Sequence, residues 1–182
     1  MRLTTWGLAG VVGVALAACG SSKEPAPSTI AAAAGAGSTQ ELNQDDLLVT
    51  ARLPRQTEEI EYVSEIGVLA KHLAQAIQAG APDLQPAAKT VSILTLRPDP
   101  DRLGNEDAHS FVMLTFNVSD LKAAQINRLG AYGVLDLATE VKPVLPWQLA
   151  IGSWCQQHDR APNFCMNTKL SLGDGVPWNG PQ

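Results

Sequence analysis

Three side chains near the C-terminal end of the chain have the types and spacing of a reactive group. Cys155 and His158 are three residues apart, and Asp159 follows directly. A thiolate beside an imidazole can act as a nucleophile with its base, and the same pair can supply two ligands to a zinc ion. Zinc would need two further ligands, and no spacing in the sequence supplies them. The group is therefore a candidate nucleophile and base, or a candidate zinc site for which the sequence supplies only two ligands.

Hard oxygen donors gather in one polar segment, at Asp99, Asp101, Asn105 and Asp107. Such donors suit calcium, and the closest pattern is the twelve-residue EF-hand loop. Counted from Asp99, however, Leu103 stands at position 5 and Ser110 at position 12, where an oxygen ligand and a bidentate glutamate are required. We interpret the segment as a solvated turn and predict no metal and no cofactor.

The familiar catalytic motifs give no further candidate. The sequence contains no nucleophile elbow, no phosphate-binding glycine loop and no dinucleotide fingerprint. We therefore do not expect an enzyme.

One helix is clearly predicted among the elements that must position these residues. Thr57 is a suitable N-cap, and Gly80 supplies the stop. Between them, apolar residues recur at spacings of three and four, at Ile66, Leu69, Ala70, Leu73, Ala76 and Ile77. Gly67 interrupts a good helix sequence at a cost of about 1 kcal/mol relative to alanine, so it suggests the close approach of another element.

Strands are predicted on both sides of this helix. Residues 47–53 precede it, while residues 90–96 and 111–118 follow it and flank the acidic segment as a hairpin. A second helix begins at residue 121 and either continues to about residue 141 or gives way to a strand at 132–137; we favour the helix. Residues 147–154 predict a last strand.

The predicted order is strand, helix, strand, strand, helix, strand, which is the split βαβ or ferredoxin-like order. The fold class expected is therefore α+β, a small antiparallel sheet with two helices packed on one face. Residues 46–182 are long enough for one such domain but not comfortably for two. Residues 173–182 show no periodicity and predict an irregular tail.

The charge balance excludes one class of partner. The formal net charge is −5, and only 17% of residues are charged. An acidic chain without a basic patch is a poor ligand for nucleic acid, so no nucleic-acid partner is predicted.

The N-terminal segment has the layout of an export signal. Arg2 is followed by an uncharged apolar stretch that is too short to cross a bilayer as a permanent helix. Small residues and a cysteine then follow as Leu16-Ala17-Ala18-Cys19. In these residues the chain resembles bacterial lipoproteins, whose lipobox reads Leu-Ala/Ser-Ala/Gly-Cys. The resemblance covers residues 1–19 alone.

The resemblance implies a processed and lipid-anchored protein. Residues 1–18 would be removed between Ala18 and Cys19, and the Cys19 sulfur and new amino terminus would be acylated, which anchors a protein to a membrane without spanning it. Gly20 and Ser21 follow, where aspartate tends to retain lipoproteins in the inner membrane. We therefore expect the outer membrane, facing the periplasm, rather than the inner membrane.

Export also bears on the other cysteines and on residues 19–45. With Cys19 lipidated, Cys155 and Cys165 remain as an even pair, for which a disulfide is the default in an oxidising compartment. Residues 19–45 are rich in serine, alanine, glycine and proline, and predict a flexible linker between membrane and domain.

The leading functional hypothesis is a cell-envelope accessory or assembly protein that binds another envelope protein. Tryptophans are natural interface anchors, and three of them fall late in the chain, at Trp147, Trp154 and Trp178. The alternative is an envelope enzyme or small-ligand binder with a pocket near His158 and Asp159. An exposed apolar patch or sheet edge favours the first hypothesis, and a deep pocket with converging polar groups favours the second.

Overall fold

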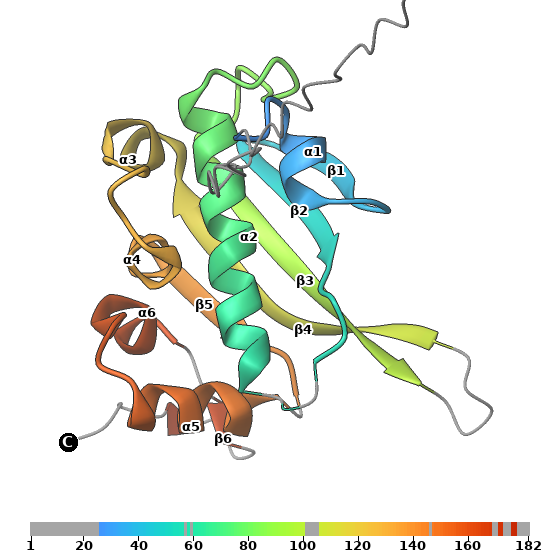
Figure 1. The fold of residues 1–182 in the computed structure, drawn as a ribbon, viewed down its shortest axis with the longest axis vertical. Coiled ribbons are helices and arrows are strands. Elements are labelled where there is room, and N and C mark those ends of the chain that lie inside the picture. The colour runs from blue at the N-terminus through green and yellow to red at the C-terminus, as the bar shows by residue number, and fades with distance from the viewer. Residues whose placement is uncertain are drawn as a thin grey trace, which may run out of the picture.

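The fold is built on a five-stranded mixed sheet, with its helices gathered on one face (Figure 1). The computed structural model describes residues 26–56, 58, 60–100, 106–145, 147–168, 171–172 and 176–177. The predicted signal peptide, the lipobox with Ala18 and Cys19, and Trp178 lie outside these residues.

The strands follow one another across the sheet in the order of the chain. They are β1 (Thr39–Asn43), β2 (Asp46–Arg52), β3 (Thr90–Pro100), β4 (Glu106–Asn117) and β5 (Glu140–Pro143). The β2–β3 pair is parallel, and the other three pairs are antiparallel. Two short strands, β6 (Ser171–Leu172) and β7 (Val176–Pro177), form a separate antiparallel pair.

The helices differ greatly in length. The longest is α2 (Glu61–Gln78), which crosses the sheet and connects β2 to β3. The shorter ones are α1 (Ile30–Ala34), α3 (Val118–Ala123), α4 (Ala131–Leu135), α5 (Gln148–Gln157) and α6 (Pro162–Met166). The predicted helix and the predicted hairpin are both confirmed, as α2 and as the β3–β4 pair. The predicted N-cap is wrong, because α2 begins at Glu61 with Ile60 as its N-cap residue, and Thr57 lies outside the described residues.

The α+β class is confirmed, but the ferredoxin-like order is wrong. In a split βαβ unit another strand lies between the two parallel strands. Here β2 and β3 are direct neighbours, with Leu47 opposite Val91 and Val49 opposite Ile93. The helix α2 therefore serves as an ordinary crossover between adjacent parallel strands, and the predicted antiparallel sheet is mixed.

Two predicted elements in the second half of the domain are also wrong. Residues 147–154 form most of α5 instead of a strand. Residues 121–141 form neither one helix nor a strand at 132–137, because α3 and α4 are separate short helices and β5 begins at Glu140. A short apolar run does not distinguish a buried strand from a buried helix, and this ambiguity produced the error at α5.

The predicted linker through residue 45 is wrong for α1 and β1. The side chain of Ile30 is 0% exposed. The amides of Ile30 and Ala31 donate to the carboxylate of Asp83 at 2.8 and 3.0 Å, and the Thr29 hydroxyl accepts from Ala32 at 3.0 Å. Four alanines are too few for an isolated helix, so these tertiary bonds explain why α1 forms. The folded domain therefore begins by Ile30.

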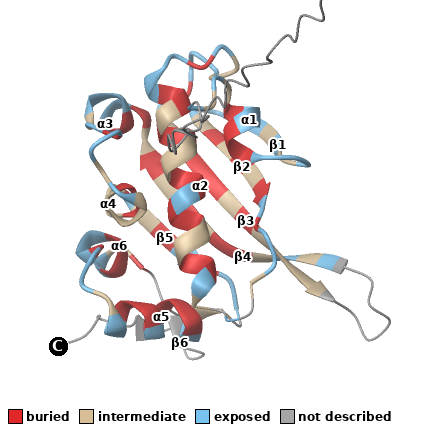
Figure 2. Cartoon of the chain, viewed as in Figure 1, coloured by how far each residue is buried: buried red, intermediate tan, exposed pale blue. Residues whose placement is uncertain are grey.

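The core lies between α2 and one face of the sheet (Figure 2). Along β2, buried Leu47, Val49 and Ala51 alternate with Leu48 and Thr50, which are partly exposed on the other face. The apolar stripe predicted for α2 is buried in full, at Ile66, Leu69, Ala70, Leu73, Ala76 and Ile77. The buried face of the strands and the apolar stripe of α2 therefore pack against each other in one core.

The expectation that Gly67 marks a close approach is confirmed. A Cβ atom at Gly67 would lie 3.1 Å from the Cβ of Ala131 and 3.3 Å from its backbone carbonyl. Those distances are shorter than ordinary van der Waals contacts. Glycine therefore lets the first turn of α4 pack directly on the backbone of α2.

Replacing Gly67 by leucine should destabilise the domain by about 1 to 3 kcal/mol, because the added side chain would force α4 away from α2. Urea unfolding of the purified protein measures this change. The control is Val68→Leu, which adds a methylene at a neighbouring residue that is 41% exposed and should change stability by less than about 0.5 kcal/mol. Equal effects at the two positions would contradict the packing described.

The attachment of α1 should depend on pH through Asp83. Partial burial raises the pKa of this carboxyl, but hydrogen bonds from Ala31, Ile30 and Gln40 outweigh burial and hold the pKa below its usual value. A depressed pKa in the folded state gives stability that is present above the unfolded-state pKa of about 4 and is lost as pH falls through the folded pKa.

We therefore expect Asp83→Asn to lower stability at pH 7 by about 1 kcal/mol, and the difference from the parent protein to shrink below about pH 4. Chemical denaturation across this pH range measures both quantities. Asp159→Asn changes an exposed aspartate whose side chain has no hydrogen bond to another described residue, and it serves as the control. A difference that stays constant with pH would contradict the role of the Asp83 carboxylate.

Candidate functional site

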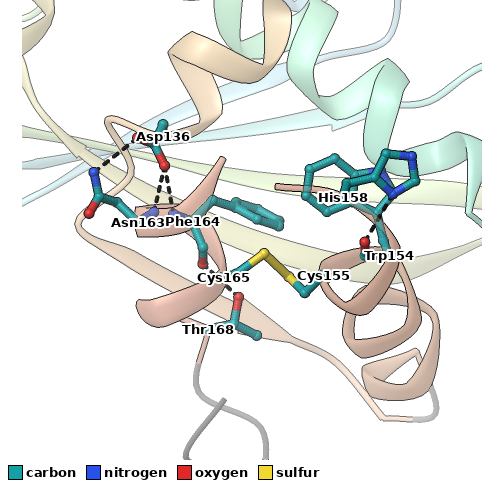
Figure 3. The surroundings of a disulfide bond; sticks show 8 residues. All are labelled: Asp136, Trp154, Cys155, His158, Asn163, Phe164, Cys165 and Thr168. Atoms are coloured by element: carbon teal, nitrogen blue, oxygen red, sulfur yellow. Dashed lines mark hydrogen bonds between the residues drawn. A yellow bond between two sulfur atoms is a disulfide. The ribbon is translucent and has the colours of Figure 1, made fainter. Parts of the chain in front are cut away.

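The candidate nucleophile Cys155 is paired with Cys165 (Figure 3). Cys155 belongs to α5 and Cys165 to α6, and their sulfur atoms lie 2.09 Å apart, at disulfide distance. A cysteine held in a disulfide has no thiolate to attack a substrate or bind zinc. The pairing therefore removes the central member of the Cys155, His158 and Asp159 group.

The histidine of that group has a packing role. The His158 ring stacks on the Trp154 ring, with centroids 4.7 Å apart and planes within 6°. Its Nδ1 lies 3.0 Å from the Trp154 carbonyl oxygen (Figure 3). Asp159 is exposed, and neither of two surface hollows, one beside Arg52 and one beside Lys122, is lined by His158 or Asp159. The His158 ring therefore covers one face of the Trp154 ring.

Asp136 fixes the position of α6, the helix that carries Cys165. Its Oδ1 accepts hydrogen bonds from the amides of Asn163 and Phe164 at 2.6 and 3.3 Å, and its Oδ2 accepts from the Asn163 side chain at 2.9 Å. The two backbone donors are among the free amides of the first turn of α6. Asp136 thus holds α6 beside α4 from outside the helix.

The acidic segment is placed only in part. Asp99 and Asp107 are opposite each other near the end of the β3–β4 hairpin, whereas Asp101 and Asn105 fall outside the described residues. No three His, Cys, Asp or Glu side chains in the described part of the chain are grouped to hold a metal ion.

The tryptophans predicted as partner anchors occupy different environments. Trp154 is 1% exposed and packs against Tyr132 and Phe164, with ring centroids 5.4 and 5.6 Å away. The prediction that Trp154 is an accessible anchor is therefore wrong, because this side chain belongs to the core. Trp147 is half-buried beneath a cation.

That cation is Arg97, in the part of β3 that extends toward the hairpin loop. Its guanidinium carbon lies 3.7 Å from the Trp147 ring centroid and 5.3 Å from that of Tyr62. Phe111 fills the space between these elements, with its ring 5.4 Å from Tyr62 and 5.9 Å from Trp147. An arginine over a tryptophan face is a favourable electrostatic contact. The cluster joins the sheet, the start of α2 and the loop before α5.

A β-bulge places Phe111 in this cluster. Thr95 is opposite Val112, whereas the next residue of β3, Leu96, is opposite Ser110, so Phe111 is an extra residue in β4. The Thr95 hydroxyl donates to the Val112 carbonyl at 2.9 Å and accepts from the Val112 amide at 3.2 Å. The bulge is thereby stabilised by a side chain, and Phe111 is fully buried.

Next to this cluster lies the feature that the sequence reasoning missed. Val144, Leu145 and Leu149 are 37%, 68% and 78% exposed, and we call these three residues the apolar surface. The Val144 amide donates to the Phe111 carbonyl at 2.9 Å, and the Trp147 amide donates to the Val144 carbonyl at 2.8 Å. The backbone beneath the apolar surface is therefore fixed to the bulged strand.

A sequence signal for this surface was present. Residues 143–157 contain no charged side chain, in a chain where 17% of residues are charged. A predicted strand at 147–154 hid this signal, because alternation would have buried every second residue. As a helix that starts at Gln148, the segment instead projects Leu149 outward.

No protein-family model, no curated protein and no solved structure matches this chain. In the described part of the chain, no helix combines the length and the hydropathy that a bilayer span requires.

Replacing both Cys155 and Cys165 by serine should lower stability by about 2 to 3 kcal/mol, the loop-entropy value for cysteines ten residues apart. Urea unfolding measures the loss. The parent protein under reducing conditions is the matched control and should lose a similar amount. Two free thiols in the untreated protein, found by intact-mass analysis after alkylation, would contradict the disulfide.

Proposed function

We propose that this protein is a membrane-anchored lipoprotein of the bacterial cell envelope that acts as an accessory or assembly protein by binding another envelope protein. The proposal places it on the outer membrane, facing the periplasm, with Cys19 as the lipidated residue. It assigns no catalytic activity to the chain.

The observation that carries the proposal is the exposure of Leu145 and Leu149 on a fixed backbone. Isolated exposed apolar residues are common, but three within six residues of an uncharged segment are a candidate site for association. A backbone that is already fixed by hydrogen bonds loses little further conformational entropy when a partner binds to it. Catalysis near His158 gains no support, since Cys155 is bonded and His158 is stacked on Trp154.

The anchor is tested by Cys19→Ser. We expect this change to block cleavage after Ala18 and to prevent lipid attachment, because the serine hydroxyl does not replace the cysteine sulfur as the lipid acceptor. Fractionation of cells into membrane and non-membrane material, together with intact-mass analysis, measures both effects. Ser21→Ala is the nearby control and should leave processing unchanged. Normal processing of Cys19→Ser with attached lipid would refute the anchor.

The association is tested by the double substitution Leu145→Glu and Leu149→Glu. Two carboxylates would have to be desolvated in the interface, and we expect the yield of chemically cross-linked complex in intact cells to fall at least about tenfold. Because both residues are exposed, the unfolding midpoint should change little.

Val68→Glu is the matched control, since it places a carboxylate at an exposed apolar residue on α2, away from the apolar surface. It should leave the complex intact. An undiminished complex in the double variant would remove the apolar surface from the proposal. If the parent protein forms no specific complex with another envelope protein, the proposed function itself fails.

A further inference from the structure

We infer that the free edge of β1 is a second contact site, at which the backbone of Gln40 and Leu42 pairs with an extended segment of the partner that carries a basic residue opposite Glu41. This inference rests on the proposed function and deepens it, because it names the kind of segment that the partner offers.

β1 lies at one edge of the sheet, and the backbone on its outer side forms no hydrogen bond with another described segment (Figure 1). The opposite edge differs, because the Val141 amide of β5 donates to the Asn167 carbonyl at 3.1 Å and Val141 forms a parallel bridge with Thr168. β1 contains no proline, no lysine and no bulge, which are devices that commonly block pairing at an edge. In the described part of the chain, β1 is therefore the edge that is open to a further strand.

The contact between β2 and β3 shows which backbone groups of β1 are free. The backbone groups of successive residues in a strand point alternately to its two sides. The Leu53 amide donates to the Leu96 carbonyl of β3 at 2.8 Å, so the even-numbered residues of β2 point toward β1. Their partners in β1 are its odd-numbered residues, and the amide and carbonyl groups of Gln40 and Leu42 therefore point away from β2. These groups offer main-chain hydrogen bonds to an added strand.

The side chains of β1 set the chemistry of that strand. Glu41 lies opposite Leu48, is exposed, and forms no ion pair or hydrogen bond through its carboxylate with another described residue. Leu42 lies opposite Leu47 on the helix-covered face and is 38% exposed. An added strand would place successive side chains beside Glu41 and Leu42 on opposite faces of the sheet. A basic residue next to an apolar one complements both positions.

Glu41 also argues against a second copy of this chain at the edge. In an antiparallel pair of two β1 strands, both outward residues of each strand are paired with outward residues only when Gln40 lies opposite Leu42 of the other copy. That register places the two Glu41 carboxylates opposite each other, and like charges in this position destabilise a sheet. The same carboxylate favours a basic side chain, so it discriminates between a second copy and the partner.

The test places a photo-activatable benzoyl-phenylalanine at position 39 of the full-length chain in intact cells. Thr39 is exposed at the start of β1, on the same face of the sheet as Glu41. We expect a protein adduct, which mass spectrometry should map to a segment with a basic residue next to an apolar one. The control is position 68, which is exposed on α2 and should give no adduct with that segment.

Two variants distinguish edge pairing from mere proximity. Leu42→Pro removes an outward amide and keeps the hydrogen bonds between β1 and β2, whereas Glu41→Lys reverses the charge and leaves the backbone unchanged. Each should lower the adduct yield from position 39 at least about tenfold. Glu58→Lys makes the same charge change at an exposed residue outside β1 and should leave the yield unchanged. Replacing the mapped basic residue of the partner by glutamate should restore the adduct of Glu41→Lys.

Other outcomes separate this inference from the proposed function. An undiminished yield in either variant with a parent-like unfolding midpoint, an adduct with a second copy of this chain, or a captured segment without a basic residue would each overturn the inference. The absence of a protein adduct from position 39, with a complex that is still lost in the Leu145→Glu and Leu149→Glu variant, would overturn it and leave the proposed function in place. A parent protein that forms no specific complex would defeat both.

Discussion

The bulge at Phe111 is the feature on which the far end of the domain depends. Phe111 is the extra residue of β4, and its ring contacts both Tyr62 of α2 and Trp147 of the loop before α5. Its carbonyl also accepts the Val144 amide, which continues the contact between β4 and the residues after β5. A single register shift therefore couples the sheet, the longest helix and the apolar surface. Bulges commonly redirect a strand or a side chain in this way at functional positions.

The helix α2 connects this end to the other. Its N-terminal turn contributes Tyr62 to the cluster with Arg97, its middle accepts α4 against Gly67, and its C-terminal end leads to Asp83, which fixes α1. The N-terminal side of the domain and the apolar surface are thus separated by the length of one rigid element.

The elements predicted correctly are those whose signals are local. The stripe of α2 and the β-branched hairpin strands depend on periodicity within one segment, and Gly67 is conspicuous because it interrupts a good helix. The missed elements depend on distant partners. The helix α1 forms because Asp83, more than fifty residues away, binds its first amides, and β5 forms because β4 offers it an edge. The exposure of Leu149 was hidden for a related reason, since α5 and a strand explain the same apolar run equally well.

The central claim is that the apolar surface exists before any partner arrives, held by Arg97, Phe111 and Trp147. Native-state hydrogen exchange of the Trp147, Ala150 and Ile151 amides in the purified protein tests it most directly, because these amides donate within the turn that carries Leu145 and Leu149. We predict protection that approaches the free energy of global unfolding. Exchange of these amides at nearly the rate of an unstructured chain, while the α2 amides stay protected, would contradict the claim.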